Sequence, residues 1–131
     1  MIKFDIETTK KEQFIDITSK VQDLVKKSKI KDGLCLVYVP HTTCSIIINE
    51  NADSNICEDI IKALSTIIPS GKWEHDKIDN NASAHIKSAM IGCSQIIPIE
   101  DNKLTLGRWQ AIMLAEFDGP RTRNVIISYQ A

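Results

Sequence analysis

Residues 34–48 read Leu34-Cys35-Leu36-Val37-Tyr38-Val39-Pro40-His41-Thr42-Thr43-Cys44-Ser45-Ile46-Ile47-Ile48. The first six of these residues are apolar and rich in β-formers, as expected of a central strand that is covered on both faces of its sheet. Pro40 ends this strand because proline cannot donate to a strand ladder. A second strand, buried for most of its length, begins at Cys44. The polar link between the two strands contains His41, one of only three histidines in the chain.

The flanking segments predict further strands around this pair. Residues 2–9 alternate between apolar and polar side chains, which is typical of a half-buried strand, and a short second strand is predicted to end at Thr18. We expect these two strands to form an antiparallel hairpin, because a short turn is the simplest connection between them. Later strands are predicted over residues 95–99, 111–117 and 125–129.

Apolar residues recur at helical spacing in three segments, which cover residues 18–30, about 54–68 and 84–91. Their expected capping residues are Thr18 with Gly33, then Asp53 or Ser54, and finally Ser83 with Gly92. The chain therefore holds about seven or eight strands and three helices, and the helices do not alternate regularly with the strands. This pattern indicates an α+β fold with a mostly antiparallel, sandwich-like sheet. A length of 131 residues fits one domain spanning residues 1–131.

Composition narrows the classes of function. The chain is 43% hydrophobic and 25% charged, with a net charge of -1, so it offers no long-range attraction to nucleic acid. No apolar run is long enough to cross a membrane, and the first five residues lack the pattern of a signal peptide. The four cysteines form no C-x-x-C pair, and we interpret them as reduced thiols in a cytoplasmic protein.

All three histidines lie at ends of predicted elements, beside polar clusters. His75 lies in a stretch of irregular pattern that begins at Trp73, His85 lies in the first turn of the predicted helix that follows it, and His41 follows a strand. Three imidazoles with an open fourth position form the usual catalytic zinc arrangement, and histidine also serves as an acid or base. Alternatively, the three histidines are ordinary packed residues. The sequence contains no H-E-x-x-H motif to decide between these readings.

Nearby charged residues suggest a phosphate or metal site. The carboxylates of Glu50, Asp53, Asp76 and Asp79 would orient imidazoles or hold Mg²⁺, or else they are simply solvated. Arg121 and Arg123 are two apart on a predicted strand, so they would project to one face and clamp a phosphate. The alternative is a charged surface strand in which these arginines pair with Asp118 or Glu116.

Seven motifs follow one another along the chain in a recognisable order. They are His41-Thr42-Thr43, Ile48-Asn49-Glu50-Asn51-Ala52-Asp53, Trp73-Glu74-His75-Asp76, Asn80, Ala84-His85, Gly107-Arg108-Trp109-Gln110 and Glu116-Phe117-Asp118-Gly119-Pro120-Arg121. Taken together they resemble the YjbQ-like family, whose members carry the name secondary thiamine-phosphate synthase. The match extends over nearly the whole chain. Mild departures are Cys44, where a smaller residue is usual, and Asn81 with Ser83.

The resemblance implies a homotrimer with sites near the subunit contacts, and a set of site residues that match the motifs. The implied catalytic residues are His41, His75, His85 and Glu50, with the three histidines as ligands of a divalent metal, Zn²⁺ or Mg²⁺. The implied substrate-binding residues are Thr42, Asn80, Trp109, Gln110 and Arg121. We therefore expect a small enzyme with a histidine-lined metal or phosphate site, with thiamine-phosphate synthase as a secondary activity. The alternative is a homotrimeric, non-catalytic module that binds a phosphorylated or anionic metabolite.

Overall fold

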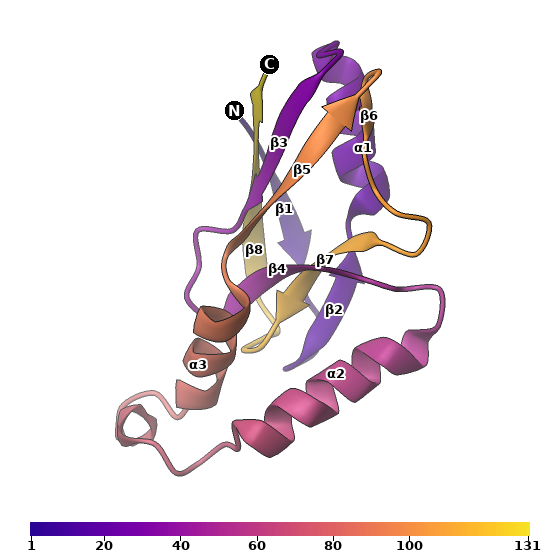
Figure 1. The fold of residues 1–131 in the computed structure, drawn as a ribbon. Coiled ribbons are helices and arrows are strands. Elements are labelled where there is room, and N and C mark those ends of the chain that lie inside the picture. The colour runs from indigo at the N-terminus through magenta and orange to yellow at the C-terminus, as the bar shows by residue number, and fades with distance from the viewer.

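The computed structural model of residues 1–131 contains two antiparallel sheets, three α-helices and one short 3-10 helix (Figure 1). The elements in chain order are β1 (Ile2–Glu7), β2 (Gln13–Asp16), α1 (Thr18–Ser28), β3 (Gly33–Tyr38), β4 (Cys44–Asn49), α2 (Ser54–Ile67), η1 (Glu74–Lys77), α3 (Ala82–Ile91), β5 (Ser94–Glu100), β6 (Lys103–Leu104), β7 (Ala111–Glu116) and β8 (Thr122–Gln130). The predicted α+β class, with its antiparallel sheets and three helices, is confirmed. None of the helices is both long and apolar enough to span a membrane.

The strands divide into a five-stranded sheet, ordered β1-β8-β3-β5-β6, and a three-stranded sheet, ordered β2-β7-β4. The strands of the two sheets run in clearly different directions (Figure 1). The predicted hairpin between the first two strands is wrong, because β1 pairs with β8 while β2 pairs with β7. Residues 8–12 carry the chain from one sheet to the other instead of turning it back. Both partners lie about a hundred residues away, where a local pattern carries no information about pairing.

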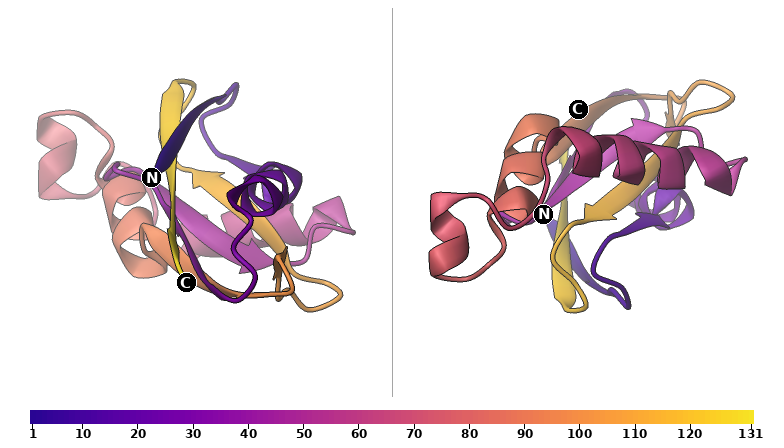
Figure 2. Two further views of the ribbon diagram at one scale, coloured as in Figure 1. Left: turned by 90° about the horizontal axis from the view of Figure 1, so that it is seen from above. Right: turned by 90° about the horizontal axis from the view of Figure 1, so that it is seen from below.

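The main core lies between the two sheets. Sixteen buried residues form one cluster. It is closed by α1, which contributes Val21, Leu24 and Val25 through one apolar stripe. The other face of the three-stranded sheet is covered by α2 and α3, where Phe117 and Ala115 pack with Ala84 (Figure 2). As a result β7 is buried on both faces, which explains its unbroken apolar run.

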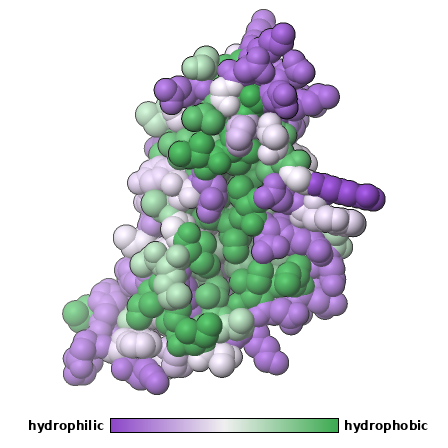
Figure 3. Space-filling model, viewed as in Figure 1, coloured by the Kyte–Doolittle hydropathy of each residue, from purple (hydrophilic) through white to green (hydrophobic).

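The outer face of the five-stranded sheet is uncovered over β3 and β5. Leu34 is 42% exposed and Ile96 is 63% exposed, and the register places Leu36 directly opposite Ile96. A band of hydrophobic side chains runs along this side of the molecule (Figure 3). The expectation that residues 34–39 are covered on both faces is therefore wrong within one chain, although β3 is central in its sheet as predicted.

Three predicted helix ends differ from the structure. Lys29, not Gly33, is the left-handed residue that ends α1, with φ +60°. Gly33 instead begins β3, where a Cβ atom would lie 2.1 Å from the Gln130 carbonyl oxygen, so only glycine fits. Asn81, not Ser83, is the N-cap of α3, and Thr18 is already the first residue of α1. Gly92 ends α3 as predicted, with φ +97°.

Asp53 is the N-cap of α2, as predicted, and its carboxylate accepts a hydrogen bond from the Asn55 amide at 3.0 Å. We expect Asp53→Ala to lower the free energy of unfolding by about 1 kcal/mol, because this helix amide then loses its partner. Urea unfolding measures the change. Asp59→Ala removes the same charge from an exposed position inside the helix and serves as the control. Equal losses in the two variants would show that charge, not capping, is responsible.

Candidate functional site

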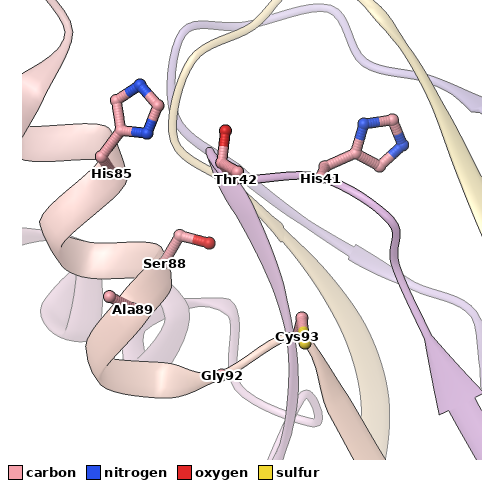
Figure 4. A pocket seen from close by; sticks show the side chains of 7 residues that line it. All are labelled: His41, Thr42, His85, Ser88, Ala89, Gly92 and Cys93. Carbon is pink, nitrogen blue, oxygen red and sulfur yellow. The ribbon is translucent and has the colours of Figure 1, made fainter.

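A pocket of about 460 Å³ lies where α3 meets the link between β3 and β4 (Figure 4). The residues that line it are His41, Thr42, His85, Ser88, Ala89, Gly92 and Cys93. Two of the three predicted site histidines therefore line the same pocket, together with the predicted Thr42, although the His41 ring points away from His85. The lining contains imidazoles and hydroxyl groups but no carboxylate. In Figure 4 the Thr42 hydroxyl lies between the two imidazole rings.

The tautomer of His41 is set by its contact with β8. The backbone N–H of Asn124 donates a hydrogen bond to His41 Nε2 at 2.9 Å. Because Nε2 accepts, the proton of the neutral ring must be on Nδ1. Burial lowers the pKa of His41, and the positive charge of Arg123 lowers it further, against an opposing contribution from Glu116. His41 is therefore a neutral ring that offers an N–H donor at Nδ1.

His85 is held in place through the backbone and side chains of α3. Ser88, one turn further along α3, donates a hydrogen bond from its Oγ to the Cys44 carbonyl at 2.7 Å, and Ser45 Oγ donates to the Ser88 carbonyl at 3.2 Å. These contacts join α3 to the first two residues of β4, which begins two residues after Thr42. The imidazole of His85 itself makes no hydrogen bond within the chain, so both of its nitrogens remain available.

His75 packs against His85 but does not line the pocket. The two rings meet edge to face, with centroids 4.9 Å apart and an interplanar angle of 86°. His75 Nε2 is 3.6 Å from Asp79 Oδ2, which is too long for a hydrogen bond. Asp76 binds the backbone amides of Trp73 and Ala82 at 3.0 Å each, and these bonds lower its pKa. A carboxylate of the chain therefore already occupies the N-terminus of α3.

The predicted metal centre does not form within one chain. No group of three His, Cys, Asp or Glu side chains lies close enough together to hold a metal ion. Nε2 of His41 is also engaged by the Asn124 amide. The residues present therefore do not fit the expected set of three histidine ligands for Zn²⁺. The pocket also lacks the carboxylates that Mg²⁺ prefers.

The two predicted phosphate-binding arginines have different surroundings. Arg121 is exposed, and it binds Asp118 through its Nε to the carbonyl oxygen at 2.8 Å and its Nη2 to Oδ2 at 3.1 Å. Arg123 is buried in an ion pair with Glu116, so it cannot reach a ligand. The pair of arginines therefore does not form a clamp. Arg121 lies outside the pocket lining, but it is near enough for its charge to lower the pKa of His41.

The remaining predicted site residues lie elsewhere in this chain. Glu50 and Gln110 flank the far ends of β4 and β7, which pair through Asn49 and Ala111, so a six-residue strand of roughly 17 Å separates them from Thr42. Trp109 is 60% exposed beside them. Asn80 is exposed at φ +53° before α3, and its side chain makes no hydrogen bond.

Five residues of this region were not predicted from the sequence as site residues: Ser88, Ala89, Gly92 and Cys93, which line the pocket, and Asn81, the N-cap of α3. Ser88 and Ala89 lie three and four residues after His85, a spacing that places all three on one face of α3, and this signal could have identified them. Asn81, which looked like a mere departure from the family motifs, donates from its side chain to Asp118 at 2.9 Å. No local pattern predicts this contact, because it joins positions that are 37 residues apart.

The lowered pKa of His41 predicts a pH dependence. We expect the ring to titrate below its ordinary value of 6.5. The unfolded chain then binds a proton near pH 6.5 while the native chain does not, so the free energy of unfolding falls as the pH drops below about 6.5. NMR titration of the His41 ring measures the midpoint, and urea unfolding of His41→Gln should lack this contribution. A midpoint at or above 6.5 would contradict the assignment.

The fold and the pocket together define a small two-sheet α+β protein with a candidate binding pocket at one end of β4. A model of the family described as UPF0047 protein YjbQ-like matches residues 2–131. The chain belongs to this family.

Its relatives come from archaea and bacteria. It is 48% identical over 127 residues to UPF0047 protein MJ1081 of Methanocaldococcus jannaschii, covering 97% of this chain and 91% of the relative. UPF0047 protein YugU of Bacillus subtilis is 42% identical, with 93% and 92% covered. The crystal structure of a YjbQ/UPF0047 family protein from Clostridium acetobutylicum matches with a TM-score of 0.95 at 44% identity, covering 99% and 100% of the two chains. These names state no activity, so the thiamine-phosphate synthase reaction stays a prediction.

Proposed function

We propose that the pocket between His41 and His85 binds a small phosphorylated or otherwise anionic metabolite. The observation that carries this proposal is the chemistry of the lining, in which a neutral N–H donor, a hydroxyl and a free imidazole belong to one pocket that contains no carboxylate. Arg121 adds a positive charge beside the pocket. A volume of about 460 Å³ lies within the usual range for small-molecule sites. The free thiols of all four cysteines are consistent with a cytoplasmic location.

Calorimetric titration with inorganic phosphate tests the proposal, followed by a thermal-shift screen of phosphomonoesters. Thr42→Val keeps the side-chain shape and removes the hydroxyl, and we expect roughly 2- to 10-fold weaker phosphate binding from the lost hydrogen bond. Thr105→Val makes the same change at an exposed position after β6 and should leave binding unchanged. An absence of phosphate and phosphomonoester binding to the wild-type protein would refute the proposal.

Catalysis is the second candidate function, because His85 has both ring nitrogens free beside the pocket and can transfer a proton. The thiamine-phosphate synthase reaction joins a pyrimidine diphosphate to a thiazole phosphate and must stabilise the departing diphosphate. Arg121 is the residue of this chain that would serve that purpose. A turnover assay with both substrates separates the two functions. Stabilisation by the substrates without product formation identifies a binding module, and product that depends on His85 identifies an enzyme.

We further propose that the protein is a homotrimer whose contacts cover the outer face of β3 and β5. Leu34, Leu36 and Ile96 line a shallow apolar depression of about 180 Å³ on this face. Exposed apolar groups gathered on one surface favour burial against a partner. A second copy is the occupant that the family resemblance implies.

Ile96→Asp is expected to break this assembly, because a carboxylate at the contact would lose its hydration without gaining a partner. Light scattering on a sizing column should give about three times the 14.7 kDa chain mass for the wild-type protein and a lower mass for the variant. Lys3→Asp introduces the same group on the polar outer side of β1 and should leave the mass unchanged. A trimer that survives Ile96→Asp would place the contact on another face.

A further inference from the structure

Asp118 is a buried carboxylate that no step of the proposed binding uses directly. It is 8% exposed and follows the end of β7. Its Oδ1 accepts a hydrogen bond from Lys11 Nζ at 2.5 Å, and its Oδ2 accepts from Asn81 Nδ2 at 2.9 Å and from Arg121 Nη2 at 3.1 Å. One side chain therefore joins the loop after β1, the start of α3 and the turn before β8.

Two of these contacts lead to opposite sides of the candidate site. Toward β8, Asp118 holds the Arg121 guanidinium through both its carboxylate and its carbonyl oxygen. Toward α3, it holds the side chain of Asn81, and the backbone carbonyl of Asn81 accepts from the His85 amide at 3.3 Å. We infer that Asp118 is a positioning residue that fixes Arg121 and His85 relative to each other. This positioning role rests on the proposed function only in the phosphate-binding part of the test below.

Charge alone predicts the opposite effect of removing Asp118. A carboxylate near an anion site repels the anion, so its loss should strengthen phosphate binding if Asp118 acts only through its field. If Asp118 acts by positioning, its loss instead lets the Arg121 guanidinium and the start of α3 adopt several conformations. Ordering these groups on binding then costs free energy, so phosphate should bind more weakly. Removal of a residue that orients a ligand-binding group at metal sites costs roughly 10- to 100-fold in affinity. At this partly exposed site we expect a loss of phosphate affinity of about tenfold, the lower end of that range. Weaker binding would indicate that Asp118 positions Arg121, and tighter binding would indicate that it acts only through its charge.

The first arm of the test needs no ligand. The Nε–H signal of Arg121, observed by 15N NMR and assigned with an Arg121→Lys sample, should be a single line protected from solvent exchange, because Nε donates to Asp118. In Asp118→Ala this signal should broaden or exchange rapidly. An unchanged Arg121 Nε–H signal in Asp118→Ala would overturn the positioning role, whether or not the protein binds phosphate.

The second arm measures calorimetric affinity for inorganic phosphate at a temperature where every variant is folded. Asp118→Ala should bind about tenfold more weakly despite its more positive charge, and Asp118→Asn, which retains an acceptor oxygen, should recover part of the loss. Glu7→Gln is the matched control, because it neutralises a carboxylate bonded to Thr122, the neighbour of Arg121, without touching the guanidinium. It should bind as the wild type or slightly more tightly. Tighter binding by Asp118→Ala would overturn the inference, whereas wild-type protein that does not bind phosphate refutes the proposed ligand and leaves the first arm to decide.

Discussion

Arg123→Met is expected to lower the free energy of unfolding by about 3–5 kcal/mol, the loss typical of breaking a buried ion pair from one side. Glu116 is 0% exposed and Arg123 is 2% exposed. Arg123 Nε donates to both carboxylate oxygens, at 2.9 and 3.0 Å, and its Nη2 donates to Thr43 Oγ1 at 2.8 Å. Without the guanidinium the Glu116 carboxylate stays in the core with only Thr8 and two backbone amides as partners.

Urea unfolding of three variants tests this prediction. The double variant Glu116→Leu with Arg123→Met should recover much of the loss, because an apolar pair of similar volume requires no desolvation of charge. Lys77→Ala removes an exposed partner of Glu74 and should change stability by less than about 1 kcal/mol. A loss below about 1 kcal/mol for the single Arg123 variant would mean that water or another group reaches Glu116.

The sequence predicts the elements of this fold better than their partners. Alternation and helical spacing correctly place most strands and all three helices, because each pattern reports which side of one element is buried. The same patterns cannot assign β1 to β8 or β2 to β7, since these pairings depend on how the whole chain closes. The apolar run of β3 likewise predicts that both faces of the strand are buried, but it does not predict which element covers each face. In one chain the outer face of β3 is exposed.

The residues of the candidate site are likewise predicted better than their surroundings. His41 and Thr42 are identified by their position after a strand, and His85 by its position at a helix start, and all three line one pocket. Arg121 and Arg123 look equivalent in sequence, yet Arg121 is exposed, whereas Arg123 is buried in an ion pair with Glu116. The difference arises because β8 begins at Thr122, which leaves Arg121 in the preceding turn. Strand boundaries are the feature that local patterns define least precisely.

Arg121→Ala should weaken phosphate binding by roughly 10- to 100-fold, the range given by losing one hydrogen bond to a charged group. The guanidinium is already oriented by Asp118 through two contacts, so little freedom is lost when a ligand binds. Arg121→Lys keeps the charge but loses the planar fork, and we expect an intermediate affinity. Calorimetric titration with phosphate at fixed ionic strength measures the three values, since salt screens the charge of an exposed group.

A control separates a local contact from general charge. Arg108 is an exposed arginine whose guanidinium carbon lies 5.1 Å from the centroid of the Trp109 ring. Arg108 precedes the start of β7, whereas Arg121 follows the end of that strand. Arg108→Ala removes the same charge and should change phosphate affinity by no more than about twofold, because exposed charges beyond a Debye length are largely screened. Equal losses of phosphate affinity in the two arginine variants would show that binding depends only on net charge. That result would refute the pocket beside His41 as the binding site. A loss confined to Arg121 places the anion within reach of the guanidinium that Asp118 holds.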